Sequence, residues 1–81
     1  MVAKSVLLNV FCENLRRFRK GKGVTQVDMA KRLGIRQGAY SSLERGVFAP
    51  TITTIEKVAQ ALDVSPTDLL LPQAKSISQS A

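Results

Sequence analysis

The sequence predicts an all-α domain made of four or five short helices. Along most of the 81-residue chain, apolar residues recur at intervals of three and four, which places them on one face of a helix. No stretch alternates between apolar and polar residues with a period of two, and no Asn-Gly or Asp-Gly pair marks a hairpin. Glycines and prolines separate the periodic segments, so each segment is expected to be a helix and a sheet has no support.

The first two helices are predicted at residues 5–20 and 26–33. Ser5 is the expected N-cap of the first helix, and the glycines that follow Lys20 give the backbone freedom with which helices end. Thr25 is the expected N-cap of the second helix, with an acidic residue three positions later that favours the positive helix start. The apolar residues at helical spacing in the second helix are Val27, Ala30 and Leu33.

The third and fourth helices are separated from their neighbours by a glycine and a proline. Gly34 ends the second helix, and a third helix is predicted over residues 37–45 with Tyr40 and Leu43 directed inward. Pro50 interrupts the chain before the fourth helix begins. The predicted apolar stripe of the fourth helix consists of Ile52, Ile55, Val58, Ala59 and Leu62.

A fifth helix of one to two turns is predicted between Ser65 and Pro72. Ser65 is its expected N-cap, the proline after Ser65 suits the first helical position, and Asp68 suits the first turn. The helix carries Leu69, Leu70 and Leu71. Residues 73–81 are rich in Ser, Gln and Ala and are expected to form a loose tail.

The positive charge of the chain is concentrated in one central stretch. The formal net charge is +6, and residues 13–45 carry nine Lys or Arg against three Asp or Glu, which by itself gives +6. Such a balance is typical of proteins that bind nucleic acid, whereas a basic run taken alone is more often a solvated helix face. The basic stretch therefore needs a scaffold that directs it toward one partner.

The residue types present exclude most enzyme and metal chemistry. Histidine is absent and Cys12 is the only cysteine, so a His-based catalytic triad, a zinc site and an intrachain disulfide are all excluded. We expect no catalytic residues, metal or cofactor, and we expect Cys12 to be a small buried hydrophobe. No apolar window reaches the roughly 18 residues of a membrane span and no signal-peptide pattern is present, so a cytoplasmic protein with no membrane contact is expected.

Two short helices and a tight turn are predicted between residues 26 and 43. Such helices cross steeply only where a small side chain lies between their axes, and Ala30 precedes Gly34 by four residues. The residues that fit the pattern are Gln26, Met29-Ala30, Leu33-Gly34-Ile35, Tyr40 and Leu43. The segment is therefore predicted to be a helix-turn-helix.

These residues resemble the Xre/Cro-type helix-turn-helix family, which includes lambdoid phage repressors, restriction-modification controller proteins and many antitoxins. The matching segments are Leu15-Arg-Arg-Phe-Arg, Gly23-Val-Thr-Gln, Met29-Ala-Lys-Arg-Leu-Gly-Ile, Leu43-Glu-Arg-Gly, Pro50 and Val58-Ala-Gln-Ala-Leu-Asp-Val-Ser. The match covers about residues 11–71, which leaves residues 1–10 as an extension that begins the first helix and residues 72–81 as a flexible tail. The resemblance implies a compact lambda-repressor-like bundle whose third helix enters the major groove of double-stranded DNA, homodimers on pseudo-palindromic sites, and no catalysis.

The resemblance places the expected DNA contacts on the second and third helices. The family's glutamine at the position of Gln26 braces a phosphate and the recognition helix, and Gln37 begins the third helix, where an amide can pair with an adenine edge. Tyr40 is expected mainly in the core, with a phosphate contact by its hydroxyl as the lesser option. The full expected set is Gln26, Arg36, Gln37, Gly38, Tyr40, Ser41, Ser42 and Arg45, with Lys31 and Arg32 as further candidate phosphate contacts.

Two positions of the third helix depart from the family. Arg36 stands where a Ser or Thr cap is usual, so the cap hydrogen bond is expected to be missing at a cost of about 1 kcal/mol, and a long cation takes its place. Gly38 stands where a side chain usually reads a base, and it costs about 1 kcal/mol of helix propensity. Direct base reading is therefore expected to be thin, with DNA shape carrying more of the specificity.

Other residues are assigned structural or self-association roles. Arg19 and Glu44 match a buried ion pair between the first and third helices of phage repressors and are expected to be structural. Two apolar sets lie outside the predicted core, and one of them is expected to form a homodimer interface rather than frayed ends of an ordinary core. These dimer candidates are Val6, Leu7 and Val10 on the first helix and Leu69, Leu70 and Leu71 on the fifth.

Two functions remain open from the sequence. The first is a sequence-specific transcriptional regulator, a repressor or controller protein, that binds double-stranded DNA as a homodimer. The alternative is a protein-interaction module, such as an antitoxin with a protein partner, whose DNA binding is weak or secondary. The departure at Gly38 and the weakly basic loop at residues 46–48 would permit this alternative.

Overall fold

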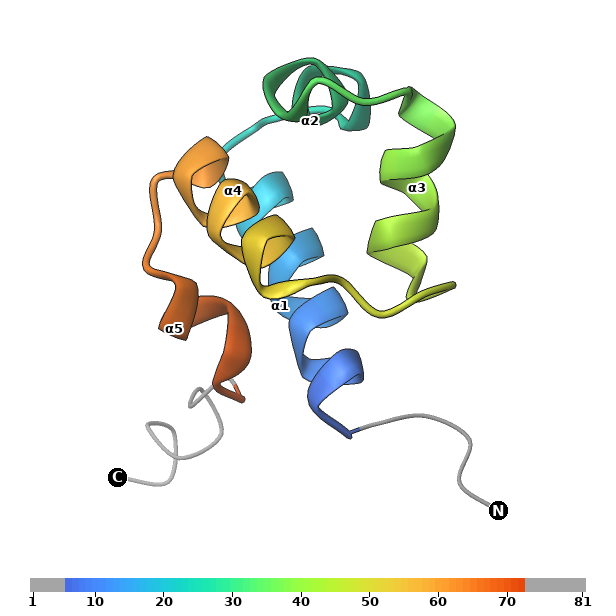
Figure 1. The fold of residues 1–81 in the computed structure, drawn as a ribbon. Coiled ribbons are helices and arrows are strands. Elements are labelled where there is room, and N and C mark those ends of the chain that lie inside the picture. Colours follow the sequence, from blue (N-terminus) through green and yellow to red (C-terminus); the bar gives the residue numbers. More distant parts are fainter. Residues whose placement is uncertain (1–5, 73–81) are drawn as a thin grey trace.

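The computed structural model describes residues 6–72, and over this range the chain forms five helices and no strand (Figure 1). The helices are α1 (Val6–Gly21), α2 (Gln26–Leu33), α3 (Gln37–Arg45), α4 (Ile52–Leu62) and α5 (Pro66–Leu70). The predicted all-α class is confirmed, and α2, α3 and α5 begin where the sequence predicts. The proposed cap at Ser5 and the predicted loose tail at residues 73–81 lie outside the described residues.

Local capping explains where α2 and α5 begin. The Thr25 hydroxyl accepts a hydrogen bond from the backbone N–H of Asp28 at 3.0 Å, and the Asp28 carboxylate accepts one from the N–H of Thr25 at 3.4 Å. Ser65 and Asp68 form the same reciprocal box at the start of α5. Each box satisfies backbone donors that have no partner within the helix, so both predicted starts are confirmed.

The core lies between the five helices, and each of them contributes buried apolar residues to it (Figure 1). Its buried apolar residues are Phe11, Cys12, Leu15, Val24, Met29, Ala30, Tyr40, Leu43, Val58, Ala59, Leu62 and Leu69. Cys12 is therefore a buried hydrophobe, as expected, and its thiol donates to the carbonyl oxygen of Leu43 at 3.6 Å. The predicted inward direction of Tyr40 and Leu43 is also confirmed.

Two residues of the predicted apolar stripes lie outside the core. Val27 is 42% exposed and Ile52 is 76% exposed. In α2 the inward side is taken by Met29 and Ala30, and Val27 points away from it. Ile52 is the first residue of α4, and the fully buried residues of that helix are Val58, Ala59 and Leu62.

A buried asparagine joins α1 to α5. Asn14 is 1% exposed, and its side-chain amide donates to the carbonyl oxygens of Leu69 at 2.9 Å and Leu71 at 2.8 Å. Its own oxygen accepts a hydrogen bond from Arg17. The last carbonyls of a helix have no partner within the helix, so Asn14 supplies donors where α5 ends. The sequence patterns did not indicate this role.

Candidate nucleic-acid interface

The turn between α2 and α3 has the backbone geometry that a helix-turn-helix requires. Gly34 has φ +69°, a left-handed conformation that glycine adopts without steric cost. The N–H of Ile35 donates to the carbonyl of Ala30 at 3.0 Å, and Ala30 is 3% exposed between the two helices. α3 therefore leaves α2 at a steep angle and stands at one side of the domain (Figure 1).

The first turn of α3 presents an exposed polar surface. Arg36, Gln37 and Gly38 are exposed, Ser41 and Ser42 are half-buried, and Arg45 is exposed at the last turn. Arg36 is the N-cap residue and makes no side-chain cap hydrogen bond, so the expected loss of a cap is confirmed. These residues lie together on the outer side of one short helix, where a long flat partner can reach them.

Gly38 leaves open space on this surface. A Cβ added at this position meets no heavy atom within 4 Å, and the backbone of Gly38 is helical. We therefore expect Gly38→Ala to raise the free energy of unfolding by about 0.5–1 kcal/mol, because alanine loses less backbone entropy in a helix. Urea titration monitored by circular dichroism measures the change. Gly34→Ala is the matched control and should destabilise, since φ is positive there; a destabilised Gly38→Ala would contradict the open geometry.

Among the expected DNA contacts, Tyr40 has to be corrected. Its side chain is fully buried at 0% exposure, and its hydroxyl donates to Oε2 of Glu44 at 2.7 Å. The ring fills the core between α3 and its neighbours, and the hydroxyl faces an internal carboxylate instead of solvent. A phosphate has no access to this hydroxyl in the structure, so we remove Tyr40 from the candidate interface.

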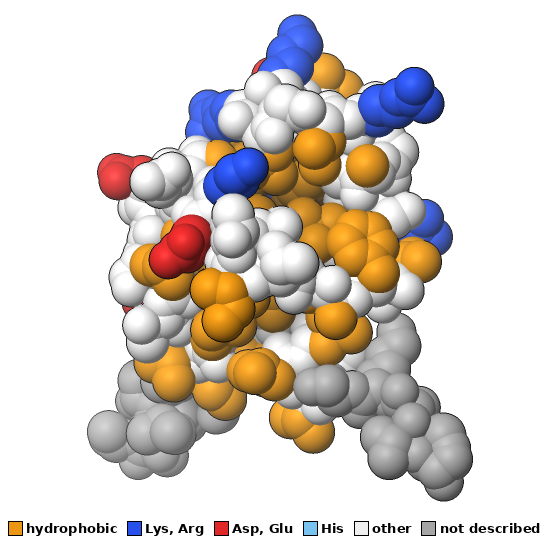
Figure 2. All heavy atoms as spheres, viewed as in Figure 1, with side chains coloured by type: hydrophobic (Ala, Val, Ile, Leu, Met, Phe, Trp, Pro, Cys, Tyr) orange, Lys and Arg blue, Asp and Glu red, His pale blue; other side chains and the backbone are white. Residues whose placement is uncertain are grey.

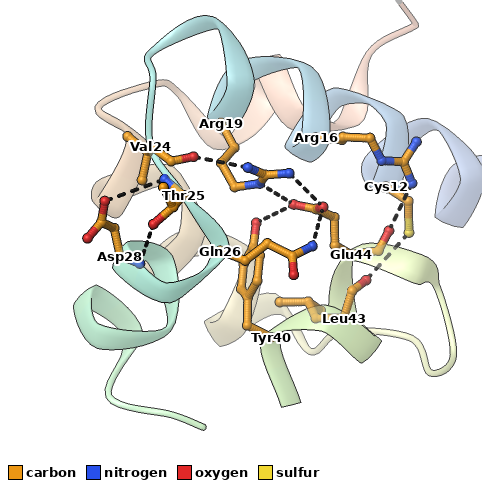
Figure 3. A network of polar contacts seen from close by, with 10 residues as sticks. All are labelled: Cys12, Arg16, Arg19, Val24, Thr25, Gln26, Asp28, Tyr40, Leu43 and Glu44. Carbon is orange, nitrogen blue, oxygen red and sulfur yellow. Dashed lines mark hydrogen bonds and ion pairs between the residues drawn. The ribbon is translucent and has the colours of Figure 1, made fainter. Parts of the chain in front are cut away.

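Behind the exposed surface of α3 lies a network centred on the Glu44 carboxylate (Figure 3). Arg19 contributes two hydrogen bonds, from Nε to Oε2 at 2.6 Å and from Nη2 to Oε1 at 3.0 Å. Arg19 also donates from Nη1 to the carbonyl of Val24 at 3.0 Å. Both charged residues are buried, at 8% and 3% exposure. The ion pair therefore ties α1 to α3, and through Val24 to the chain that enters α2.

Gln26 belongs to the same network. Its amide nitrogen donates to Oε1 of Glu44 at 3.0 Å, so the side chain that opens α2 is joined to the last turn of α3 (Figure 3). Gln26 is half-buried. Among the described residues, no buried side-chain nitrogen or oxygen lacks a hydrogen-bond partner.

The network shifts the acid–base behaviour of its members. Burial raises the pKa of Glu44, but hydrogen bonds from Arg19, Tyr40 and Gln26 outweigh it and hold this pKa below its ordinary value. Burial and the hydrogen bond to Glu44 raise the pKa of Tyr40, so its hydroxyl remains a donor. The hydrogen bond to Glu44 raises the pKa of Arg19. At neutral pH the centre is therefore an anionic carboxylate held by a cation and neutral donors.

Other cations of α1 and α2 lie away from the Glu44 carboxylate. Arg16 donates to the backbone carbonyl of Glu44 at 3.4 Å, near the end of α3. Arg32 donates to the carbonyl of Ala61 at 2.8 Å, and this carbonyl is one of the last in α4. Lys31 lies beside Arg32 in a shallow hollow that also includes Lys57. Arg32 is thus engaged at the α2–α4 contact, and the exposed face of α3 is formed by other residues.

The dimer candidates divide between surface and core. Leu69 is 0% exposed and belongs to the core, so its place among the candidates is wrong. α5 is short, and its one fully inward position is Leu69. Val6, Leu7 and Leu71 are exposed, and Val10 and Leu70 are half-buried. The first set therefore offers surface, whereas the second set offers it only at its end.

An apolar groove of about 180 Å³ lies between α1, α5 and the start of α4. We call it the apolar groove, and its lining residues are Leu7, Leu8, Phe11, Ala49, Pro50, Ile55 and Leu70. None of these residues is charged. Hydrophobic side chains also predominate over the lower part of the surface in Figure 2, whereas the Lys and Arg side chains in that view lie higher.

Comparison with known proteins defines the class of protein to which this fold belongs. The helix-turn-helix family model matches residues 15–69, and the chain belongs to this family of DNA-binding transcriptional regulators, in its Xre-like branch. It is 46% identical over 59 residues to the uncharacterized helix-turn-helix-type transcriptional regulator y4dJ of Sinorhizobium fredii. That match covers 73% of this chain and 77% of y4dJ.

Solved structures support the same assignment. A hypothetical transcription factor, NHTF from Neisseria, superposes with a TM-score of 0.80 at 33% identity, over 93% of this chain and 84% of that one. The restriction-modification controller protein C.AhdI from Aeromonas hydrophila superposes with a TM-score of 0.71 at 34% identity, over 76% of this chain and 94% of that one. The lambda-repressor-like bundle expected from the sequence is thus confirmed at the level of fold.

In the part of the chain that the structure describes, residues 6–72, no helix has the length and apolar character needed to cross a bilayer.

Proposed function

We propose that the protein is a sequence-specific regulator of transcription, a repressor or controller protein, that reads double-stranded DNA with α3. The observation that carries this proposal is the exposed polar first turn of α3, held from behind by the buried Glu44 network. A recognition helix should present its side chains to base edges from a fixed position on its scaffold. Freedom of movement that the unbound protein has is lost on binding, and this loss lowers affinity. Binding to double-stranded DNA agrees with the cytoplasmic location expected from the sequence.

The residues of the interface divide into base-reading and phosphate-binding groups. Gln37 is exposed at the start of α3, and its amide offers the paired donor and acceptor that an adenine edge requires in the major groove. Ser41 and Ser42 extend the same surface by one turn. Arg36 reaches a guanine or a phosphate, and the remaining phosphate contacts are assigned to Gln26 and Arg45.

Gly38 shapes how specificity arises. With no side chain at Gly38, α3 has one base-reading position fewer and allows close approach of its backbone to the groove. We infer that sequence-dependent DNA shape contributes to the choice of site alongside Gln37.

The proposed operator-binding form is a homodimer in which a second copy covers the apolar groove. A chain with a net charge of +6 is repelled from another copy wherever cations face one another. The groove has no charged lining residue, so two copies meet there without like charges. Dimerisation also removes Leu7 and its neighbours from water, which adds to the stability of a small domain.

Loss of the Gln37 amide tests the base-reading role. On the duplex that the wild-type protein enriches from a random pool, we expect Gln37→Ala to raise the dissociation constant about 5- to 150-fold, because a bidentate base contact contributes about 1–3 kcal/mol. Binding to a scrambled duplex of the same length is expected to stay unchanged.

Fluorescence anisotropy at fixed salt measures both affinities. Gln60→Ala is the matched control, an exposed glutamine on α4 outside the interface, and should leave both values as in the wild type. Equal losses on the enriched and scrambled duplexes would contradict base reading by Gln37.

A further inference from the structure

The Glu44 carboxylate collects hydrogen bonds from three separate helices. Arg19 of α1 reaches both oxygens, the Tyr40 hydroxyl of α3 reaches Oε2 at 2.7 Å, and the Gln26 amide of α2 reaches Oε1 at 3.0 Å (Figure 3). Each oxygen therefore has two donors. Tyr40 and Gln26 lie on opposite oxygens of the same planar group, so the position of one affects the position of the other.

We propose that Tyr40 is a positioning residue for DNA binding, and that its hydroxyl acts through Glu44 to hold Gln26 in the orientation that receives a DNA phosphate oxygen. This inference rests on the proposed function, because it assigns the phosphate contact at Gln26 to the same interface. Tyr40 itself is fully buried and does not touch the nucleic acid. Its contribution passes through the carboxylate.

The geometry explains why Gln26 needs such support. A glutamine side chain has several rotatable bonds, and fixing them at the moment of binding lowers affinity. In the structure one amide hydrogen of Gln26 is already committed to Glu44 at 3.0 Å. The second amide hydrogen and the amide oxygen remain on a half-buried side chain at the first residue of α2, where backbone N–H groups also favour an anion.

Tyr40 determines how well the carboxylate performs this task. Without the Tyr40 hydroxyl, Oε2 keeps only the hydrogen bond from Nε of Arg19, so the carboxylate is held by one contact fewer on that side. The Tyr40 hydroxyl approaches from α3 itself, four residues before Glu44, and fixes the second oxygen relative to the recognition helix. Because the raised pKa of Tyr40 keeps its proton in place, the hydroxyl donates throughout the neutral range.

A double-mutant cycle on DNA affinity tests this relay. The variants are Tyr40→Phe, which keeps the buried ring, Gln26→Ala, and the two combined, each titrated onto the duplex enriched by the wild type. We expect Tyr40→Phe to weaken binding about fivefold, which is in the range of the net contribution of one typical intramolecular hydrogen bond. In the Gln26→Ala background the same substitution should weaken binding less than twofold, because the group it positions is gone.

A second readout and a control separate positioning from mere stability. The side-chain amide resonances of Gln26 in a ¹⁵N-labelled protein should shift and narrow toward free-amide values in Tyr40→Phe. Val58→Ala, a buried substitution outside the network, should lower stability but leave DNA affinity and these resonances unchanged where the variant is fully folded.

The outcomes are distinct. Equal effects of Tyr40→Phe in both backgrounds, or unchanged Gln26 resonances, would overturn the relay while wild-type binding to the enriched duplex upholds the proposed function. A wild-type protein that enriches no duplex would overturn both.

Discussion

Replacement of Arg19 by leucine is expected to lower the free energy of unfolding by about 3–5 kcal/mol. Arg19 is 8% exposed and supplies two of the four hydrogen bonds to the Glu44 carboxylate. Leucine leaves the Glu44 carboxylate, whose residue is 3% exposed, without a cation. A buried unpaired charge costs far more free energy than the loss of an ion pair at the surface. Urea denaturation of both proteins at neutral pH measures the difference.

Two further variants check the cause of this loss. Lys20→Ala, a change of the adjacent exposed cation, should alter stability by less than about 0.5 kcal/mol. Adding Glu44→Gln to Arg19→Leu should recover part of the loss, since the buried charge is then removed and the amide oxygen still accepts from Tyr40. A loss below about 1 kcal/mol for Arg19→Leu would show that the ion pair does not hold α1 to α3.

The same network fixes the direction of the pH dependence. The folded protein holds the pKa of Glu44 below its ordinary value, so Glu44 contributes stability at all pH values above that ordinary value. This contribution is lost as the pH falls from the ordinary carboxyl pKa through the lower folded pKa, where the folded state must also take up the proton. The free energies of unfolding of the wild type and of Glu44→Gln, measured as a function of pH, should therefore differ above that pH window and converge below it.

Replacement of Leu69 by alanine is expected to lower the free energy of unfolding by about 2–5 kcal/mol. Leu69 is 0% exposed, and its removal leaves a cavity where α5 packs against α1 and α4. Leu71, two residues later, is 54% exposed, so Leu71→Ala should change the stability of the monomer by less than about 0.5 kcal/mol.

The pair of leucine variants separates core from surface between the last turn of α5 and its C-cap residue, Leu71. Thermal or urea unfolding at a protein concentration low enough to keep the chain monomeric gives both values. Similar small losses of unfolding free energy for the two variants would show that Leu69 is not a core residue. Similar large losses would show that Leu71 belongs to the core.

The sequence was sufficient for the helices because their ends are set locally. Thr25, Ser65 and the glycines at positions 34 and 46 act through neighbouring backbone groups, and the structure has caps at each of these positions. The periodicity was less reliable for individual side chains. Val27 and Ile52 satisfy the helical spacing but are exposed, since spacing identifies a face and does not say which neighbours cover it.

The candidate site was only partly predictable for a related reason. The pairing of Arg19 with Glu44 followed from the family resemblance, and the structure has this contact. The convergence of Gln26 and Tyr40 on the same carboxylate depends on how three helices pack, which no short-range pattern encodes. The inward direction of Tyr40 followed from the spacing, but its hydrogen bond to Glu44 did not. The bonds from Asn14 to the end of α5 had no signal beyond a polar residue among apolar neighbours.

The most direct test of α3 as a DNA-reading element is selection from a random duplex pool with the purified protein. The pool is incubated at about physiological salt with excess non-specific competitor, and the retained duplexes are sequenced. We predict an inverted repeat with half-sites about 10 base pairs apart, because a two-fold homodimer places its two recognition helices one turn of DNA apart. Retention without enrichment, falling steeply with salt, would contradict sequence-specific regulation and would favour a protein-interaction module that binds DNA through charge alone.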